Sequence, residues 1–463
     1  MKHIDCLIFV PGINAIAHRE RFTTIYDFPR GALSLASFLK AKGVSSLIIP
    51  LDFYMPPSNN PEDIEAGIGK IVEAISREYR PLVAGISAPY TMLYPASLKI
   101  AENCKKFMPS AITCMGGPHV SYRDTQCFED SAYVDIIVRG EGEWALLEII
   151  DAVKNKRDLN DIKGITFRIP PVPPLKKGGE GGFRIIQNPP HPLGDINELP
   201  ILDYTLLPED FVRNMAVSIV ASRGCAYKCS YCNESKFWGH KVRKIPIDKV
   251  MEEIRILGSN YNNYPVGLED SMFDMRSSYF FEFCSRLSGL RLNPNLYLLS
   301  RVDSVSEDGY GAMRKAGIRN IILGIESASQ KVLQFMNKKI TAGQAEDACK
   351  TAAGSGLIVG AFWIIGHPGD SPAESEITLK TMDKFYSEGI LQTSEVALFV
   401  PYPGTDIFEQ PEKYELEILS YDWERWGRFN TDPVCRLKDF KSDEIKLYWK
   451  KGVEIDRKWR NKK

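Results

Sequence analysis

A repeated strand–helix pattern is the feature of this sequence that most restricts its fold. Across residues 209–410, a short apolar run is followed by a stretch with helical spacing of apolar residues six times. Apolar strands that alternate with helices form parallel sheets covered by those helices. The pattern therefore predicts an open, partial (β/α)6 barrel whose working face lies where the strands end. The expected strands are Ala216–Ser222, Pro265–Glu269, Leu296–Arg301, Asn320–Ile325, Ile358–Ile365 and Glu395–Val400.

Residues 1–155 show the same alternation in a shorter form. The expected strands are Ile4–Val10, Val44–Leu51, Leu82–Ser87, Ala111–Met115 and Val134–Val138. Amphipathic stretches separate them, which predicts a doubly wound, Rossmann-like α/β domain with a ligand crevice at the carboxyl ends of its strands. Three glycine-containing segments near these ends would let a phosphate-bearing ligand approach the backbone closely. No G-x-G-x-x-G follows the first strand, which argues against a nicotinamide-binding domain.

Two further regions complete the chain. Residues 156–208 read as a connector, in which Ile165–Ile169 and Phe183–Gln187 are expected to pair as a hairpin. Between these strands lies a segment rich in Pro, Gly and Lys, residues 170–182, which is typical of a mobile loop. Residues 411–463 form a C-terminal extension whose four tryptophans are expected to pack in a core.

Charge and hydropathy exclude several classes of protein. Lys plus Arg number 58 and Asp plus Glu 59, so no global basic field exists to hold nucleic acid. No apolar run is long enough to span a bilayer, so we expect no transmembrane segment. The N-terminal residues lead directly into a short strand, which does not resemble a signal peptide. We therefore expect a cytoplasmic protein.

The ten cysteines are unevenly distributed. Seven are scattered singly, mostly among apolar residues, where cysteine usually acts as a small buried hydrophobe. The other three, Cys225, Cys229 and Cys232, lie within eight residues directly after the first strand of the predicted barrel. This distribution favours a reducing compartment and a single metal site over a disulfide framework.

Three thiolates at this spacing can hold three irons of a cubane cluster and leave the fourth iron open to a small molecule. A structural zinc site is the first alternative, but it requires four ligands, usually in two separated pairs. His240 is a candidate fourth ligand, and no partner of a second pair accompanies it. The second alternative is a chance cluster of unliganded thiols.

The motif Cys225-Ala-Tyr-Lys-Cys229-Ser-Tyr-Cys232 resembles the signature of radical S-adenosylmethionine enzymes. The order and spacing of later segments resemble the branch of that superfamily with an N-terminal cobalamin-binding domain. These segments are residues 267–273, 301–303, 324–327, 336–338, 365–369 and 401–405. The resemblance covers the chain up to about residue 410 and implies an anaerobic enzyme with a 4Fe–4S cluster on the three cysteines, S-adenosylmethionine and cobalamin.

The resemblance also implies roles for polar residues at the strand ends. Tyr231 would lie against the adenine, Glu269 and Asp270 would accept a hydrogen bond from the methionine amine, and Arg301 would pair with the methionine carboxylate. Glu326 and Ser327 would contact the ribose hydroxyls or the methionine moiety. The alternative for all six residues is that they only cap strand ends or pair with their neighbours.

For cobalamin, the resemblance implies a site built from three loops of the N-terminal domain. Its expected residues are Gly85, Ile86, Ser87, Gly116, Gly117, Pro118, His119, Gly140, Glu141, Gly142 and Glu143. The sequence departs from many cobalamin proteins in one respect, because it lacks the D-x-H-x-x-G motif that supplies an axial histidine. Asp52-Phe-Tyr54 occupies a comparable place without a histidine, so the lower face of cobalt has no assigned ligand.

These implications favour a methyltransferase that acts on an unactivated carbon. The alternatives are a cyclase or oxidative enzyme that uses the same cofactors without methyl transfer, and a cobalamin or redox sensor whose cluster does not turn over. The expected partners are a small-molecule, lipid or peptide substrate and an electron donor such as flavodoxin or ferredoxin.

Overall fold

The computed structural model describes residues 1–12, 28–58, 60–169, 183–262, 267–290, 296–427 and 430–462. They form two compact units, Met1–Met215 (unit 1) and Ala216–Lys463 (unit 2). The predicted mobile loop at residues 170–182 lies outside the described residues. None of the described helices combines the length and apolar character that a membrane crossing requires.

Unit 1 is built on a seven-stranded sheet with the order β2-β1-β3-β4-β5-β6-β7. Its first five strands are parallel. They are β1 (Lys2–Val10), β2 (Ser46–Pro50), β3 (Tyr79–Ser87), β4 (Ile112–Gly116) and β5 (Ile136–Val138). The strand order reverses between β1 and β3, which creates a switch point where α/β sheets bind ligands beyond the strand ends. The predicted doubly wound fold is confirmed.

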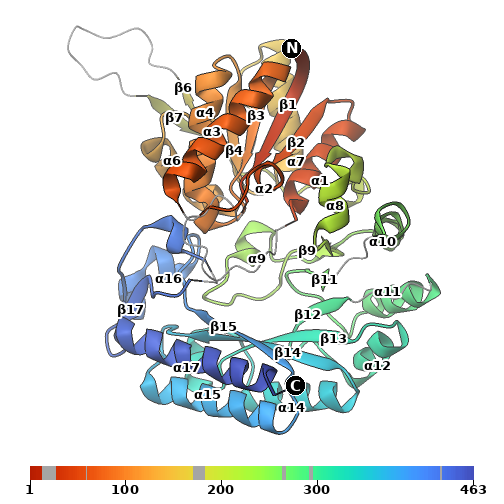
Figure 1. Ribbon diagram of the computed structural model, residues 1–463, viewed down its shortest axis with the longest axis vertical. Helices are drawn as coiled ribbons and strands as arrows, with labels where there is room; N and C mark the ends of the chain where they lie inside the picture. Colours follow the sequence, from red (N-terminus) through yellow and green to blue (C-terminus); the bar gives the residue numbers. More distant parts are fainter. Residues whose placement is uncertain are drawn as a thin grey trace. The chain divides into compact units, whose positions relative to one another are not determined.

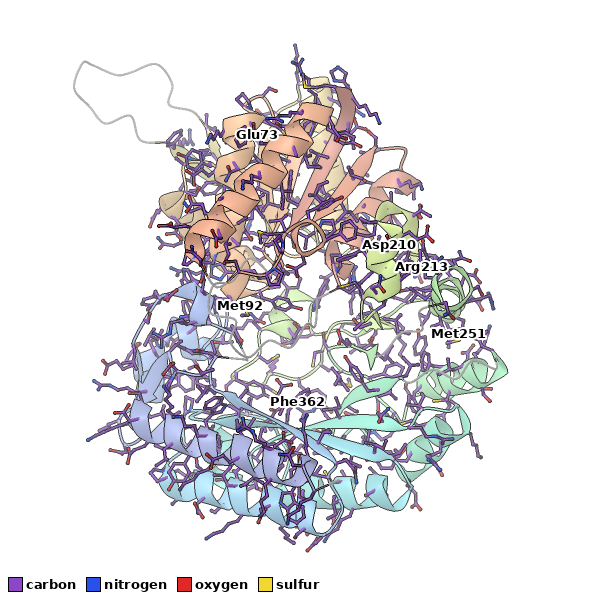
Figure 2. All side chains as sticks on the ribbon, in the orientation of Figure 1. Glu73, Met92, Asp210, Arg213, Met251 and Phe362 are labelled. Carbon is purple, nitrogen blue, oxygen red and sulfur yellow. The ribbon has the colours of Figure 1, made fainter. Side chains whose placement is uncertain are left out.

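The helices of unit 1 pack in pairs against this sheet, α1 with α7 and α3 with α4 (Figure 1). The helices are α1 (Arg30–Ala41), α2 (Leu51–Tyr54), α3 (Pro61–Glu78), α4 (Tyr94–Phe107), α5 (Pro118–Tyr122), α6 (Asp124–Asp130), α7 (Gly142–Asn155) and α8 (Glu209–Asn214). In α3 the buried side chains recur at helical spacing, as with Ile64 and Ile68. Charged side chains such as Glu73 stand on its other face, where Glu73 pairs with Arg77 (Figure 2).

The predicted hairpin is present, but it is part of the unit 1 sheet. Strands β6 (Ile165–Ile169) and β7 (Arg184–Gln187) pair antiparallel with each other, and β6 pairs antiparallel with β5. Burial of the β6 side chains Ile165 and Phe167 joins the hairpin to the core of the sheet. The contacts therefore divide the chain after Met215, whereas the sequence suggested a separate connector at residues 156–208.

Unit 2 is built on a six-stranded parallel sheet with the order β15-β14-β13-β12-β11-β8. Its strands are β8 (Ser218–Ile219), β11 (Gly267–Leu268), β12 (Tyr297–Arg301), β13 (Asn320–Glu326), β14 (Ile358–Ile365) and β15 (Thr393–Leu398). The strands follow one another across the sheet in chain order, and β8 and β15 are its two edges. This is the predicted open (β/α)6 barrel, which is confirmed.

The helices α12, α14 and α15 lie on one side of this sheet (Figure 1). The helices of unit 2 are α9 (Glu234–Phe237), α10 (Ile247–Tyr261), α11 (Ser278–Gly289), α12 (Glu307–Lys315), α13 (Gln330–Phe335), α14 (Ala342–Gly354), α15 (Pro372–Ser387), α16 (Asp406–Glu409) and α17 (Ser442–Arg460). Met251 illustrates their packing, since it lies on the buried face of α10 (Figure 2).

The first predicted strand of the barrel, Ala216–Ser222, is interrupted. After β8 the chain leaves the sheet and forms β9 (Ser222–Arg223), which pairs antiparallel with β10 (Arg243–Lys244). At the break, the Asp270 carboxylate accepts hydrogen bonds from the Ala221 backbone N–H (2.6 Å) and the Ser222 hydroxyl (2.5 Å). The three clustered cysteines lie in the segment between β9 and β10.

The C-terminal extension is part of unit 2. Helix α17 packs on α15 and β15, and the Trp449 indole donates to the Val396 carbonyl at 2.8 Å. Trp426 is fully buried in an apolar cluster with Val400 and Phe408. A two-stranded antiparallel sheet, β16 (Leu416–Ile418) and β17 (Cys435–Leu437), precedes α17 in the chain. The predicted core packing of Trp426 and Trp449 is confirmed.

Candidate cluster and cofactor sites

The cysteine loop, defined here as residues 224–232, has a fixed backbone. Gly224 has a φ of +106°, and a Cβ added there would lie 2.4 Å from the Lys241 carbonyl oxygen, so the loop begins at a position that only glycine fits. The Cys225 backbone N–H donates to the Gly239 carbonyl at 3.2 Å, and that of Cys232 donates to the Cys229 carbonyl at 3.2 Å. These contacts hold the three thiols on one short, ordered segment.

The three thiols are neighbours on this loop. Cys229 lies close enough to act electrostatically on the pKa of both Cys225 and Cys232, which burial raises above its ordinary value. Within the described residues, no three His, Cys, Asp or Glu side chains converge as single-ion ligands. A cubane with one open iron takes three thiolates, whereas a structural zinc site requires four ligands, so three thiols on one loop match the ligand number of a cluster.

The remaining seven cysteines behave as predicted. All are buried, and none of them forms a disulfide. Burial raises the pKa of the Cys284 and Cys349 thiols to about 12. Their scattered, buried positions fit the predicted role of small buried hydrophobes.

Arg301, the last residue of β12, contacts the cysteine loop directly. Its Nη1 donates to the Cys229 Sγ at 3.4 Å, and its Cζ lies 3.6 Å from the centre of the Tyr227 ring. The Asp303 carboxylate accepts from Nε at 2.8 Å and from Nη2 at 3.0 Å. The expected pairing of Arg301 with a methionine carboxylate stays a prediction, and in this structure the guanidinium binds protein groups.

A second support for the loop comes from the short segment Met336–Lys338 after α13. The Ser230 backbone N–H donates to the Met336 carbonyl at 3.0 Å, and the Asn337 side chain donates to the Lys228 carbonyl at 2.7 Å. Arg301 also donates to the Lys338 carbonyl. The sequence marked this segment only through its family resemblance, since no propensity or spacing reveals contacts across 100 residues.

Glu326, Lys338 and Tyr231 form a buried polar network. The Lys338 ammonium, 2% exposed, donates to the Tyr231 hydroxyl at 3.0 Å and to the Glu326 Oε1 at 3.1 Å. Tyr231 also donates to Glu326 at 3.3 Å. Glu326 has a φ of +69° at a register shift between β13 and β14. A left-handed backbone is costly for a residue with a Cβ and gathers at functional sites. In this chain the left-handed backbone of Glu326 accompanies the burial of its side chain in the network with Lys338 and Tyr231.

The other three predicted S-adenosylmethionine residues are engaged within the protein. Glu269 accepts a hydrogen bond from the Tyr297 hydroxyl, and Asp270 holds the break after β8. Ser327 is buried, with its hydroxyl 3.0 Å from that of Thr378. Strand-end capping therefore accounts for the Asp270 and Ser327 side chains, while their contact with S-adenosylmethionine stays a prediction.

His367 is a site residue to which the sequence analysis gave no role. It is fully buried, and its Nε2 lies 3.3 Å from the Ser230 hydroxyl while its ring packs edge-on against Tyr231. Burial lowers the pKa of His367 to about 3, so the ring is neutral at physiological pH. The signal that could have found it is its place in the Ile365–Gly369 segment at the end of β14.

In unit 1, the loops after β3, β4 and β5 come from neighbouring strands. Gly117 has a φ of +129°, and an added Cβ would lie 2.3 Å from the Ala88 carbonyl oxygen. The Ala88 backbone N–H donates to the Gly116 carbonyl at 2.7 Å, which ties the first loop to the second. The Gly140 backbone N–H donates to the Ser121 hydroxyl at 3.0 Å. Glycine at position 117 thus permits a close approach of two predicted cobalamin loops.

Several side chains in these loops support the loops themselves. Glu143 is buried and accepts from the Ser34 hydroxyl at 2.7 Å, and Glu141 accepts from the Gly194 backbone N–H at 3.3 Å. His119 is buried against the Tyr94 ring, with centroids 4.2 Å apart. Burial lowers the pKa of His119 to about 3, so it carries no charge at neutral pH.

The remaining predicted cobalamin residues lie in or beside the strands. Gly85 and Ile86 are inside β3 and pair with both β1 and β4, while Ser87 is the last residue of that strand. Pro118 is the first residue of α5, and Gly142 is the first residue of α7. Contact of these residues with cobalamin stays a prediction.

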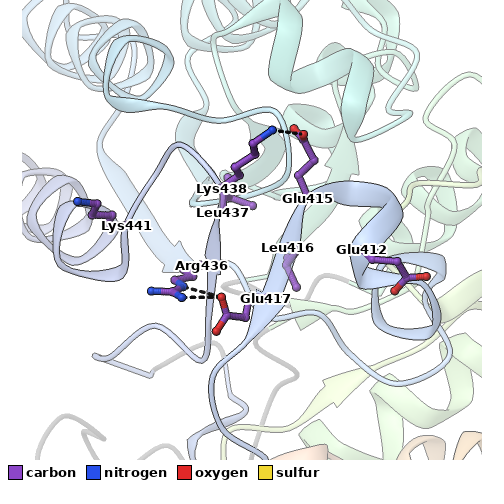
Figure 3. A pocket seen from close by; sticks show the side chains of 8 residues that line it. All are labelled: Glu412, Glu415, Leu416, Glu417, Arg436, Leu437, Lys438 and Lys441. Carbon is purple, nitrogen blue, oxygen red and sulfur yellow. Dashed lines mark hydrogen bonds and ion pairs between the residues drawn. The ribbon is translucent and has the colours of Figure 1, made fainter.

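A hollow of about 460 Å³ lies beside β16 and β17 (Figure 3). Part of its charged lining is paired, because Lys438 binds Glu415 at 3.2 Å and Arg436 binds Glu417 at 2.7 Å. None of the predicted site residues lines it. We therefore do not assign it to the cofactor sites.

Comparison with known proteins adds independent findings. The family described as the radical SAM superfamily matches residues 219–382, and the family described as the B12 binding domain matches residues 27–150. An uncharacterised methyltransferase of Pyrococcus horikoshii is 29% identical over 457 residues, which cover 98% of this chain and 92% of that protein. An anaerobic magnesium-protoporphyrin IX monomethyl ester cyclase of Rubrivivax gelatinosus is 27% identical over 417 residues, or 86% of this chain and 68% of the cyclase.

Among solved structures, the radical S-adenosylmethionine methyltransferase TsrM from Kitasatospora setae, bound to cobalamin and a 4Fe–4S cluster, matches with a TM-score of 0.72. The match covers 98% of this chain and 89% of TsrM, at 15% sequence identity. At this identity the likeness is one of fold.

Proposed function

Because the chain belongs to the cobalamin-binding radical S-adenosylmethionine enzymes, we propose that it is a methyltransferase acting on an unactivated carbon. The observation that carries the proposal is the cysteine loop, whose three neighbouring thiols match the ligand number of a cubane with one open iron, whereas a structural zinc site requires four ligands. The similar methyltransferase of Pyrococcus horikoshii supports methyl transfer, since it aligns along nearly the whole of both chains.

In this proposal Cys225, Cys229 and Cys232 hold the cluster, and the loops after β3, β4 and β5 bind cobalamin. When bound, the cluster with S-adenosylmethionine would supply radical chemistry, and cobalamin would supply methyl-transfer chemistry. The chain's own residues orient these groups. Arg301 and the Met336–Lys338 segment hold the cysteine loop, and Gly117 lets two of the loops that would bind the corrin approach each other closely.

The buried network beside the cysteine loop would receive S-adenosylmethionine. Tyr231 would lie against the adenine through backbone contacts, and the Glu326 carboxylate would accept from the ribose hydroxyls. Lys338 keeps the buried Glu326 carboxylate compensated, and the neutral His367 packs against Tyr231 without adding charge. Such a preorganised site would exclude water. It would also restrict which C–H bonds the reactive radical can reach.

A cyclase or oxidative reaction with the same cofactors is the second candidate. It is supported by the similarity to the Rubrivivax gelatinosus cyclase, which this chain matches over 68% of its length. A sensor whose cluster does not turn over fits the family less well, because its relatives are named as enzymes.

We place the reaction in the cytoplasm, with a low-potential donor such as flavodoxin or ferredoxin as the electron source. The ten free cysteines support a reducing compartment. The substrate would be a small molecule, lipid or peptide.

The proposal is tested by anaerobic reconstitution with iron, sulfide and cobalamin, followed by incubation with an extract of the source cells, S-adenosylmethionine and a reductant. Mass spectrometry should find one extract component in which a methyl group has replaced a hydrogen atom. This product should be absent when the Cys225→Ala variant is used. A product that loses hydrogen without gaining carbon would instead support the cyclase or oxidative reaction.

A further inference from the structure

Arg301 presents a buried positive charge to a sulfur of the cysteine loop. Its side chain is 9% exposed, its Nη1 donates to the Cys229 Sγ at 3.4 Å, and its Cζ lies 3.6 Å from the centre of the Tyr227 ring. Both partners belong to the cysteine loop. The charge acts on the loop at short range, through protein that screens it less than water does.

The orientation of this guanidinium is fixed on its other edge. Nε and Nη2 donate to the two oxygens of Asp303, and Nη2 also donates to the Lys338 carbonyl. All three nitrogens therefore have protein acceptors. Asp303 binds the Nε and Nη2 edge of the guanidinium, while Cys229 accepts from Nη1. The planar guanidinium therefore cannot rotate away from the sulfur without breaking its hydrogen bonds to Asp303.

We infer that Arg301 is a positioning residue that raises the reduction potential of the cluster through its hydrogen bond to the Cys229 sulfur. The inference rests on the proposed function, in which Cys229 binds iron. Reduction transfers one electron from a low-potential donor to the cluster and makes or breaks no bond. The reduced cluster carries one more negative charge, which a nearby buried cation stabilises. The family resemblance gave Arg301 a different role, that of pairing with S-adenosylmethionine.

The two roles differ in a measurable way. A hydrogen bond to sulfur acts on the cluster whether or not S-adenosylmethionine is present, whereas a carboxylate partner acts only when it is bound. The experiment is therefore an anaerobic redox titration of the reconstituted full chain without S-adenosylmethionine, followed by electron paramagnetic resonance of the reduced cluster. Iron and sulfide content are measured for every sample.

We expect Arg301→Gln to shift the midpoint potential to a more negative value at unchanged iron content, and Arg301→Lys to shift it less because the charge remains. Asp303→Asn removes the countercharge and should shift the potential in the opposite, positive direction. Arg286→Gln is the matched control. Arg286 also donates to carboxylate oxygens, those of Asp248 and Glu282, but on the surface of α11, and its replacement should leave the potential unchanged.

The inference is overturned if Arg301→Gln retains its iron and its potential, or if its shift appears only after S-adenosylmethionine is added. If Arg301→Gln takes up no iron, the sign of the Asp303→Asn shift decides, and a negative or absent shift overturns the inference. Failure of the cluster assignment on which the inference rests has a separate signature, since the wild-type chain would then bind no cluster at all.

Discussion

Replacing Lys338 by Met should destabilise unit 2 even before any cofactor binds. Lys338 is 2% exposed and Glu326 12% exposed by side chain, and their charged atoms lie 3.1 Å apart. Met has a similar volume but leaves the Glu326 carboxylate buried without its cation. Removal of one partner from a buried ion pair costs about 3–5 kcal/mol. The remaining hydrogen bond from Tyr231 and the partial exposure of Glu326 favour the lower value, about 3 kcal/mol.

For a domain of this size, each kcal/mol lowers the melting temperature by about 2–4 °C, so Lys338→Met should lower it by roughly 6–12 °C. The assay is thermal unfolding of the iron-free protein, followed by far-ultraviolet circular dichroism. Lys438→Met is the matched control, because Lys438, just after β17, binds Glu415, just before β16, and both side chains are mostly exposed (Figure 3). An exposed ion pair contributes little to the free energy of unfolding, so the control should have the melting temperature of the wild type.

A double-mutant cycle then isolates the pair. Because Glu326→Gln removes the charge that Lys338→Met would leave unpaired, the double variant should be more stable than the sum of the single effects predicts, by about 1–3 kcal/mol. If the two single effects on the free energy of unfolding are strictly additive, the stabilising role of the buried pair is refuted. The same holds if Lys338→Met has the melting temperature of the Lys438→Met control.

Three further predictions address the cluster, the cobalamin loops and pH. Cys225→Ala should abolish the visible absorption and iron content of the reconstituted protein, whereas Cys284→Ala should retain both; equal loss would mean that the ligands are misassigned. Gly117→Ala should lower bound cobalamin at constant iron, because its Cβ meets the Ala88 carbonyl, whereas Gly31→Ala, which meets no atom within 4 Å, should not. Burial raises the pKa of Asp370 to about 6, so the folded protein keeps a proton that the unfolded chain releases above about pH 4. This contribution to stability is lost as pH rises. Between about pH 5 and pH 7, the free energy of unfolding measured by chemical denaturation should fall by roughly 1 kcal/mol more for wild type than for Asp370→Asn. Parallel dependence of the two unfolding free energies on pH would contradict the prediction.

The sequence predicted those parts of the fold that depend on local pattern. Each buried parallel strand is a short apolar run next to a helix, so strands such as β13 and β14 lie close to their expected positions. The break between β8 and β9 was missed because it depends on Asp270, which lies 49 residues further along the chain. An apolar run in the sequence indicates that a strand is buried, but it does not indicate where a hydrogen bond from a distant residue ends that strand.

The same distinction applies to the site. The cysteine spacing identified the loop, because ligand number and spacing are local properties. The partners of Arg301 could not be read from the sequence, since Cys229 lies 72 residues before it and Lys338 lies 37 residues after it. The left-handed backbone of Glu326 also has no local signal, because a glutamate adopts it only where surrounding contacts impose it.

The most direct test of the account is the stoichiometry of the two products of S-adenosylmethionine. The reconstituted enzyme is supplied with the extract fraction that contains its substrate, and both products are quantified by liquid chromatography and mass spectrometry. Methyl transfer through cobalamin requires one S-adenosylmethionine as methyl donor and another as radical source. We predict S-adenosylhomocysteine and 5′-deoxyadenosine in about equal amounts during turnover. If the substrate is consumed with 5′-deoxyadenosine but no S-adenosylhomocysteine, methyl transfer is contradicted and the cyclase or oxidative reaction takes its place.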